Sequence, residues 1–351
     1  MKHLFIISQL LFLYSCCNKP ESTIRIWNYD DFIKKDVKMS DIADEMTIIQ
    51  PDSIDYKGAR IVHASSFFLA GTEQGILKYN NQGHFIGRIG AIGQGPGEYS
   101  RFYAMAINET ERIIYVYRMN TSELLSFSYE GTFLNKHSLQ LPKKWAWSFY
   151  YLKDKFYFYY CVDADNESQP YMYAITDTMG NLLSSKRDES LHFASGSYPS
   201  FPSDHLGIYG DTMLVWSQYS DTIYRVSEKE EEAFAIWGEW DKRLTPAKVE
   251  NDAYEQSMII STIVETVHYY LCIWRPAGIM WNQWNYCFYD KSSGKLFNSE
   301  GITDDLWGLP SIFPYNYYVM DGREYLECGY PTYKLLDAWL TSDDPKITKA
   351  S

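Results

Sequence analysis

One element recurs along this chain: an alternating run of apolar and polar residues, a polar turn, and a second alternating run. The clearest copies turn at Gly83, Gly131 and Gly180, which are 48 and 49 residues apart. Two less regular copies follow at residues 222–236 and 285–297. Alternation on both sides of turn residues is the pattern of a β-hairpin, so the chain is expected to consist of repeated hairpins.

Further strand-like runs lie between these hairpins, for example at residues 112–117, 155–162 and 212–216. Each unit of about 50 residues therefore holds about four strands, which is typical of a β-propeller. The residues from about 51 to 342 divide into six such units better than into five or seven. The sequence thus predicts an all-β fold, a six-bladed β-propeller of four-stranded blades.

Aromatic residues make up 17% of the chain. They favour strands and fill the space between facing sheets. Helical signal is scarce, and the best candidate is a short helix or loop within residues 246–256. A strand at residues 45–50 is expected to pair with the last blade and close the ring. We assign the propeller to residues 41–342 and a flexible tail to residues 343–351.

The start of the chain has the form of an export signal. A basic start precedes an apolar run over residues 4–14, far shorter than the roughly 20 residues that span a bilayer. The run ends in a sequence that resembles a bacterial lipobox, with Cys16 as the lipid acceptor. We therefore expect a lipoprotein signal peptide at residues 1–15 and a lipidated spacer at residues 16–40, with membrane contact through this lipid only. An ordinary signal peptide is the alternative.

A glycine-rich segment at residues 87–99 stands out, ending in Gly93-Gln-Gly95-Pro96-Gly97-Glu98-Tyr99. A phosphate-binding loop is excluded because no Lys-Ser/Thr pair follows and Glu98 would repel phosphate. A dinucleotide fingerprint is excluded because the glycine spacing is wrong and no helical pattern follows. We expect a tight connection between blades, in which glycines permit positive φ and Glu98 and Tyr99 hold the turn by hydrogen bonds.

The segment from Gly83 to Phe102 resembles the NHL-type propeller repeat and, more closely, the six-bladed β-propeller lipoproteins of Bacteroidetes. The resemblance covers most of the chain after the leader. It implies a propeller that is exported and lipid-anchored to the outer membrane, on its periplasmic or surface side, and it implies no defined activity. Where the NHL repeat has Asp and then Arg, this chain has Arg118 and Glu123, so an ion pair with exchanged charges can persist.

Four cysteines follow Cys17, and none lies in a CxxC pair or at zinc-ligand spacing. Two of them, Cys272 and Cys287, lie in strand-like runs that a symmetric hairpin would place opposite each other. Opposed strand residues are at disulfide-compatible distances, and an exported protein meets an oxidising environment. A Cys272–Cys287 disulfide and a pair of buried thiols both remain open.

Catalytic motifs are absent from the sequence: there is no GxSxG, HExxH or HxH. Residues 163–167 resemble the start of a calcium loop but lack its later Gly and Glu. We therefore assign no catalytic residue, metal or cofactor. The first candidates for chemistry at a channel mouth are His63, Glu265 and His268. The net charge of −13 argues against a nucleic-acid partner.

Two loops combine tryptophan with basic or amide side chains, one at residues 143–147 and the other at residues 274–284. Flat apolar rings beside polar donors suit sugar rings or peptides, although large aromatics also pack between blades. The binding candidates are Trp145, Trp147, Arg275, Trp281 and Trp284.

The sequence leaves three possible functions open. The first is an envelope-anchored binding or interaction module for a glycan or a protein partner. The second is an enzyme at the channel mouth, either a metal-dependent hydrolase or a polysaccharide lyase. The third is a structural subunit of an envelope complex. Propellers host many functions, so the fold does not choose among them.

Overall fold

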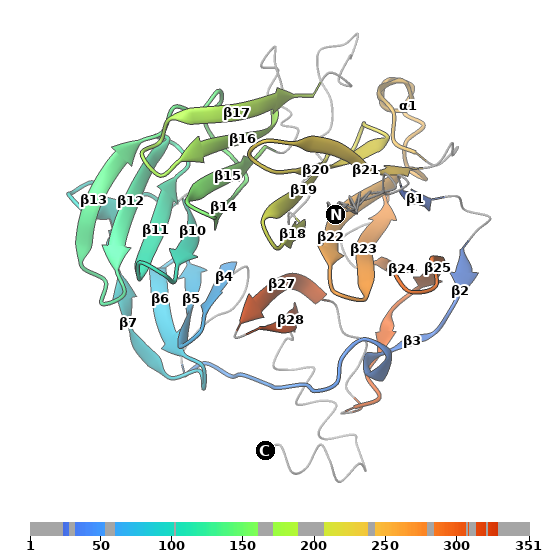
Figure 1. Cartoon of the computed structure of the whole chain (residues 1–351), viewed down its shortest axis with the longest axis horizontal. Coiled ribbons are helices and arrows are strands. Elements are labelled where there is room, and N and C mark those ends of the chain that lie inside the picture. Colours follow the sequence, from blue (N-terminus) through green and yellow to red (C-terminus); the bar gives the residue numbers. More distant parts are fainter. Residues whose placement is uncertain are drawn as a thin grey trace, which may run out of the picture.

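The structure is a computed structural model that describes residues 24–27, 32–52, 60–101, 103–160, 171–188, 207–237, 243–278, 284–306, 308, 314–320 and 322–328. It is a β-propeller whose blades are antiparallel four-stranded sheets arranged around a common axis (Figure 1). The leader, Cys16, Trp281, residues 163–167 and the tail lie outside the described residues.

Five four-stranded blades follow one another along the chain. Blade 1 holds β4 (Arg60–Ala64), β5 (Phe67–Thr72), β6 (Gly75–Asn80) and β7 (Phe85–Ile89). Blade 2 holds β10 (Tyr103–Asn108), β11 (Ile113–Arg118), β12 (Glu123–Ser128) and β13 (Phe133–Ser138). Blade 3 holds β14 (Ser148–Leu152), β15 (Lys155–Tyr159), β16 (Tyr171–Asp177) and β17 (Leu182–Arg187).

The last two blades follow the same plan. Blade 4 holds β18 (Gly207–Tyr209), β19 (Thr212–Trp216), β20 (Thr222–Val226) and β21 (Glu231–Trp237). Blade 5 holds β22 (Met258–Glu265), β23 (Tyr269–Pro276), β24 (Asn285–Asp290) and β25 (Lys295–Ser299). A short helix, α1 (Pro246–Glu250), lies between them, where a short helix or loop is predicted.

The prediction of six blades is wrong, because the described residues form five. The five blades run from Arg60 to Ser299, which keeps the spacing of roughly 50 residues seen in the repeats. The division into six assumed that residues up to 342 continue the same repeat. Beyond Ser299, the described residues form one hairpin, β27 (Pro314–Met320) with β28 (Arg323–Cys328). It lies between blades 5 and 1, with β27 beside β22 and β4 (Figure 1).

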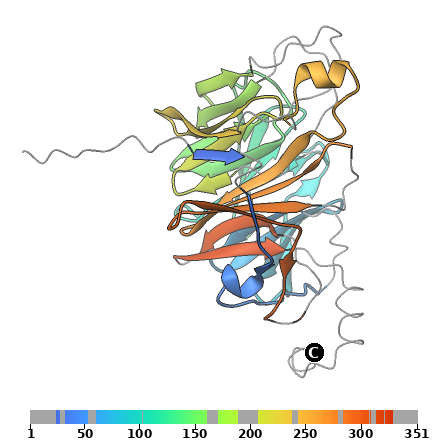
Figure 2. The same ribbon diagram turned by 90° about the vertical axis from the view of Figure 1, so that its right-hand side faces the viewer.

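The N-terminal part of the chain runs along the outer edges of the ring (Figure 2). β1 (Ile24–Trp27) pairs in parallel with β21, and β2 (Ile33–Lys34) pairs in parallel with β25. β3 (Val37–Lys38) pairs with β26 (Ile302–Thr303), and a 3-10 turn follows at Met39–Asp41. Residues assigned to a spacer therefore add strands to blades 4 and 5.

The predicted strand at residues 45–50 is wrong, since that segment contains no strand. Ile48 and Ile49 are exposed there, so these residues have no core face to bury. The ring closes instead through the hairpin β27–β28. Its Tyr318 stacks on His63 of blade 1, and Tyr317 packs with the apolar cluster of blade 5.

Glycines at the hairpin turns explain why the first three repeats share a sequence pattern. Gly131 has a φ of 85° and Gly180 a φ of 89°, a region that favours glycine. A Cβ built at Gly131 would lie 2.6 Å from the carbonyl oxygen of Arg88, and one at Gly180 would lie 2.6 Å from that of Ser138. Each turn therefore needs glycine both for its backbone angle and for the close approach of the preceding blade.

The core lies between facing sheets and is rich in aromatic rings. One cluster joins blades 2 and 3 through Tyr117, Phe149 and Phe158, which pack at centroid distances of 5.2–5.7 Å. At the edge of blade 2, Arg118 lies 2.6 Å from Glu123, so the ion pair with exchanged charges is present. Among the described residues, no helix is long and apolar enough to cross a membrane.

The propeller has two distinct faces. The innermost strands of the blades are β4, β10, β14, β18 and β22, and they run in one direction. Contacts between residues at the ends of neighbouring strands show this shared direction. Glu109 after β10 accepts hydrogen bonds from the backbone N–H of Ser65 after β4, and Asn108 bonds Tyr151 near the end of β14. We call the face where these strands begin the strand-start face and the opposite one the strand-end face.

Candidate functional site

The loop before β14 presents two tryptophans on the strand-start face. Trp145 and Trp147 are 46% and 37% exposed, whereas Ala146 between them is fully buried. Trp145 has a φ of 63°, a conformation that bulky residues rarely adopt and that stores strain. The fold therefore holds two large apolar rings toward solvent at an energetic cost.

Three hydrogen bonds fix the backbone of this loop. The N–H of Trp145 donates to the carbonyl of Met119, that of Ala146 to the hydroxyl of Tyr117, and that of Trp147 to the carbonyl of Tyr159. Burial raises the pKa of Tyr117 to about 12, so this hydroxyl stays protonated across the physiological range. The rings are therefore presented by a rigid backbone.

A cation from another blade joins Trp147. Arg60, at the start of β4, donates a hydrogen bond of 3.2 Å to the carbonyl oxygen of Trp147. Its guanidinium lies 6.0 Å from the centre of the Trp147 ring, at the outer limit for a cation–π contact. The pair links blades 1 and 3 past the start of β10, where Tyr103 is buried and donates to the carbonyl of Thr72.

The second predicted loop contributes another cation–aromatic pair on the same face. Arg275 in β23 lies 5.7 Å from the ring centre of Trp284, which precedes β24. Arg275 is buried, with its guanidinium donating to the carbonyl of Pro276. The structure thus pairs two of the predicted residues in blade 5, while Trp145 and Trp147 belong to blade 3. Trp281 lies outside the described residues.

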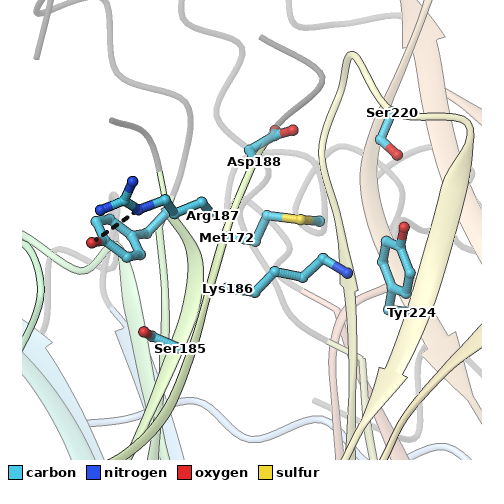
Figure 3. Close-up of a pocket in the computed structure, with 8 residues that line it drawn as sticks. Met172, Ser185, Lys186, Arg187, Asp188, Ser220 and Tyr224 are labelled. Carbon is cyan, nitrogen blue, oxygen red and sulfur yellow. Dashed lines mark hydrogen bonds between the residues drawn. The ribbon is translucent and has the colours of Figure 1, made fainter. Parts of the chain in front are cut away.

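A pocket of about 660 Å³ opens between blades 3 and 4 (Figure 3). It lies at the beginning of β16 and the end of β17, so it belongs to the strand-start face. Its lining is mostly polar and includes two tyrosine rings. The lining residues are Tyr171, Met172, Ser185, Lys186, Arg187, Asp188, Ser220 and Tyr224.

The cations of this pocket are held by neighbouring groups. Lys186 points toward Tyr224 (Figure 3), with its Nζ 3.7 Å from the ring centre, and pairs with Glu231. Arg187 lies over the ring of Tyr171 and donates to its hydroxyl at 3.4 Å. Sequence reasoning missed this pocket, because its residues come from two blades and carry no motif. Tyrosine rings beside fixed polar groups are suited to a polar ring-shaped ligand.

The glycine-rich segment forms the connection between blades 1 and 2. β8 (Ala91–Ile92) pairs in parallel with β9 (Glu98–Tyr99). The Glu98 carboxylate accepts a hydrogen bond of 2.6 Å from the N–H of Gly95. The buried Tyr99 hydroxyl donates to the carbonyl of Ile89 and accepts from the N–H of Ile76. A Cβ at Gly93 would meet the Glu98 carboxylate at 2.1 Å, so this position needs glycine.

The catalytic candidates Glu265 and His63 lie toward the strand-end face, and both form contacts with neighbouring side chains. Glu265, at the end of β22, is 3% exposed and accepts from Arg225 and Lys291, each at 2.9 Å. This network links blades 4 and 5 on the strand-end face. His63 lies 3.3 Å from Glu327 and stacks on a tyrosine of the closing hairpin.

His268 is exposed in the turn between β22 and β23, where its backbone carbonyl accepts a hydrogen bond from the N–H of Lys291. Within the described ranges, no group of three or more His, Cys, Asp or Glu side chains is placed to hold a metal ion.

The two central cysteines are direct partners across strands. Cys272 in β23 pairs with Cys287 in β24 in the register of a symmetric hairpin. Both are buried and carry free thiols in the structure. Burial raises the pKa of each thiol well above its usual range, which makes the reactive thiolate scarce.

Comparison with solved structures shows related folds. A Bacteroides fragilis protein named as exported has a TM-score of 0.63 and 15% identity, with 90% of this chain and 92% of that chain covered. A member of the DUF4221 family from Bacteroides vulgatus has a TM-score of 0.49 and 12% identity, with coverage of 76% and 86%. PorZ, a surface component of the type-IX secretion system of Porphyromonas gingivalis, has a TM-score of 0.39 and 10% identity, with coverage of 78% and 30%.

At 15% identity, the similarity to the Bacteroides fragilis protein shows the fold alone. No curated protein is detectably similar in sequence. The resemblance to six-bladed, NHL-like lipoproteins is not confirmed by these comparisons. The family described as Domain of unknown function (DUF4934) matches residues 24–350, so this chain belongs to that family.

Proposed function

We propose that this protein is a binding module of the bacterial cell envelope that takes glycans on its strand-start face. The observation that carries the proposal is the strained, half-exposed Trp145 beside Trp147 and Arg60. Backbone strain persists only where the surroundings impose it, and it concentrates at functional sites. At Trp145 this strain accompanies a ring that is 46% exposed, so the imposed backbone angle coincides with a surface that a ligand can reach.

The chemistry of this face supports a sugar ligand. Tryptophan rings offer flat apolar surfaces, and the neighbouring guanidinium and backbone groups supply hydrogen bonds that orient a hydroxylated ring. The Arg275–Trp284 pair and the pocket around Tyr171 and Tyr224 lie on the same face and repeat this combination. An oligosaccharide can use several such sites at once, which raises its overall affinity.

The proposed location in the cell envelope is supported by the N-terminal leader and by the fold comparison. The apolar run at residues 4–14 and the lipobox-like Cys16 indicate export with a lipid anchor. The similar protein of Bacteroides fragilis, which is covered over 92% of its length, is itself named as exported. A propeller tethered in this way would be held at the cell envelope, where its binding face can meet envelope glycans.

A thermal-shift screen of the soluble form from Asn18 onward tests this proposal with a panel of neutral and acidic glycans. A ligand at about 100 times its Kd adds about 2.7 kcal/mol, which moves the Tm by a few degrees. We expect one glycan class to raise the Tm, and Trp147→Ala to remove this rise. Leu134→Ala on the opposite rim is the control and should keep it.

Two results would count against glycan binding. A panel with no shift, together with capture of an envelope protein that Trp147→Ala abolishes, would make a protein the partner of the same face. A glycan shift that survives both Trp145→Ala and Trp147→Ala would place the binding site elsewhere.

A further inference from the structure

Large apolar side chains are exposed mainly on the strand-end face. The outermost strands of blades 1, 2 and 3 each begin there with two exposed apolar residues. These pairs are Phe85 with Ile86, Phe133 with Leu134, and Leu182 with Leu183. Met179, Val267 and Val319 are also exposed in or beside turns of this face. By contrast, the strand-start face exposes Ile92 and the two tryptophans of the candidate site.

We call the three pairs the apolar rim. They occupy equivalent positions after the turns at Gly83, Gly131 and Gly180, so they lie at the same height around three neighbouring blades. Single exposed apolar residues are ordinary, but a row of pairs at one level marks an interaction surface.

The N-terminal strand shows from which side the chain reaches the propeller. β21 runs from the strand-end face to the strand-start face, and β1 runs parallel to it, with Ile24 opposite Ala235. β1 therefore begins toward the strand-end side of blade 4, next to the blade that carries Leu182 and Leu183.

The proposed lipid anchor is close enough to use this approach. Eight residues separate Cys16 from Ile24 and span at most about 28 Å when extended. Ala235 lies four residues from the start of β21 at Glu231, which is about 13 Å along a strand. A fully extended tether of this length that continued the line of β1 would pass the strand-end face by roughly 15 Å.

We infer that the protein rests on a zwitterionic lipid surface through its strand-end face, with the apolar rim in contact and the strand-start face directed outward. The inference rests on the proposed lipidation of Cys16. Charges of both signs lie near the rim, as in the exposed ion pairs Arg112–Glu130 and Lys153–Asp211. The contact therefore rests on the apolar side chains, which need no charged headgroup.

Fluorescence quenching by nitroxide-labelled phosphatidylcholine tests this orientation in the full-length lipidated protein on phosphatidylcholine vesicles. An environment-sensitive fluorophore is attached at Gln82→Cys or Gln74→Cys, in a background of Cys17→Ser and Cys161→Ser. Both glutamines are exposed in hairpin turns of blade 1, at its strand-end and strand-start ends respectively. They form a matched pair.

We expect strong quenching at position 82 and several-fold weaker quenching at position 74. Combining Ile86→Ser, Leu134→Ser and Leu183→Ser should reduce quenching at position 82 while the protein still floats with the vesicles. Equal quenching at both positions, or stronger quenching at position 74, would overturn the orientation.

If the lipidated protein does not float with the vesicles, Cys16 does not anchor it in the membrane, and the inference is overturned. That failure would leave glycan binding by the soluble form untouched, so the two proposals fail separately.

Discussion

The guanidinium of Arg60 donates a hydrogen bond to the carbonyl oxygen of Trp147, although 87 residues and one complete blade separate them. This contact fixes the position of an exposed ring from two sides, since Trp147 also donates its N–H to the carbonyl of Tyr159. A binding surface held by a fixed backbone loses little conformational freedom when a ligand arrives. This geometry supports the proposed recognition on the strand-start face.

At position 145, replacement by glycine should destabilise the protein less than replacement by alanine, which is the reverse of the usual order. Both Trp145→Gly and Trp145→Ala remove the same ring, but glycine alone accepts a φ of 63° without strain. We expect the Gly variant to be more stable than the Ala variant by about 1 kcal/mol, as measured by urea unfolding. If the Ala variant is the more stable one, the backbone at this position is not strained in solution.

Two buried tyrosines provide a matched test of the connection between blades 1 and 2. Tyr99→Phe removes a hydroxyl that bonds both Ile76 and Ile89, so it should lower the free energy of unfolding by about 1–3 kcal/mol. Tyr129→Phe removes a buried hydroxyl that has no hydrogen-bond partner among the described residues, so it should be neutral or slightly stabilising. Equal losses in chemical denaturation would argue against the hydrogen-bonded role of Tyr99.

Glu265 should contribute more to stability than an exposed ion pair. Glu265→Gln leaves Arg225 and Lys291 facing a neutral amide, and their side chains are 17% and 23% exposed. We expect a loss of about 2–3 kcal/mol, somewhat below that for a fully buried pair. Asp211→Asn, which breaks the exposed pair with Lys153, is the control and should cost less than about 1 kcal/mol. Similar losses for the two variants would contradict the role of Glu265 as a link between blades.

Cys272 and Cys287 should resist alkylation in the native protein. Burial raises the pKa of both thiols, so even at pH 9 the thiolate required for the reaction is rare. We expect no modification by iodoacetamide until urea unfolds the protein, and modification of both cysteines thereafter without a reductant. If both stay unmodified in urea until a reductant is added, mass spectrometry should show a disulfide between them.

Local patterns in the sequence were enough to predict the blades. Alternation around Gly83, Gly131 and Gly180 predicts the hairpins β6–β7, β12–β13 and β16–β17, and the structure confirms them. The period of two and the need for positive φ are both properties of a few adjacent residues. The same reasoning placed Cys272 opposite Cys287, because a symmetric hairpin fixes its own register.

Long-range relations could not be read from the sequence. The blade count failed because dividing a length assumes that the repeat continues, whereas the described residues after Ser299 form one hairpin. The pairing of Arg60 with Trp147 and the pocket between blades 3 and 4 depend on which blades are neighbours. The edge strands β1 and β2 were missed because each is only two to four residues long and pairs across more than 200 residues.

The central claim is that the strand-start face binds a glycan through Trp147. The most direct test is a glycan array probed with the soluble protein, with Trp147→Ala and with the control Leu134→Ala. The account predicts that the unaltered protein and the control bind one common glycan class, and that Trp147→Ala loses at least ten-fold in affinity for it. Equal binding by all three proteins, or no glycan bound by any of them, would contradict it.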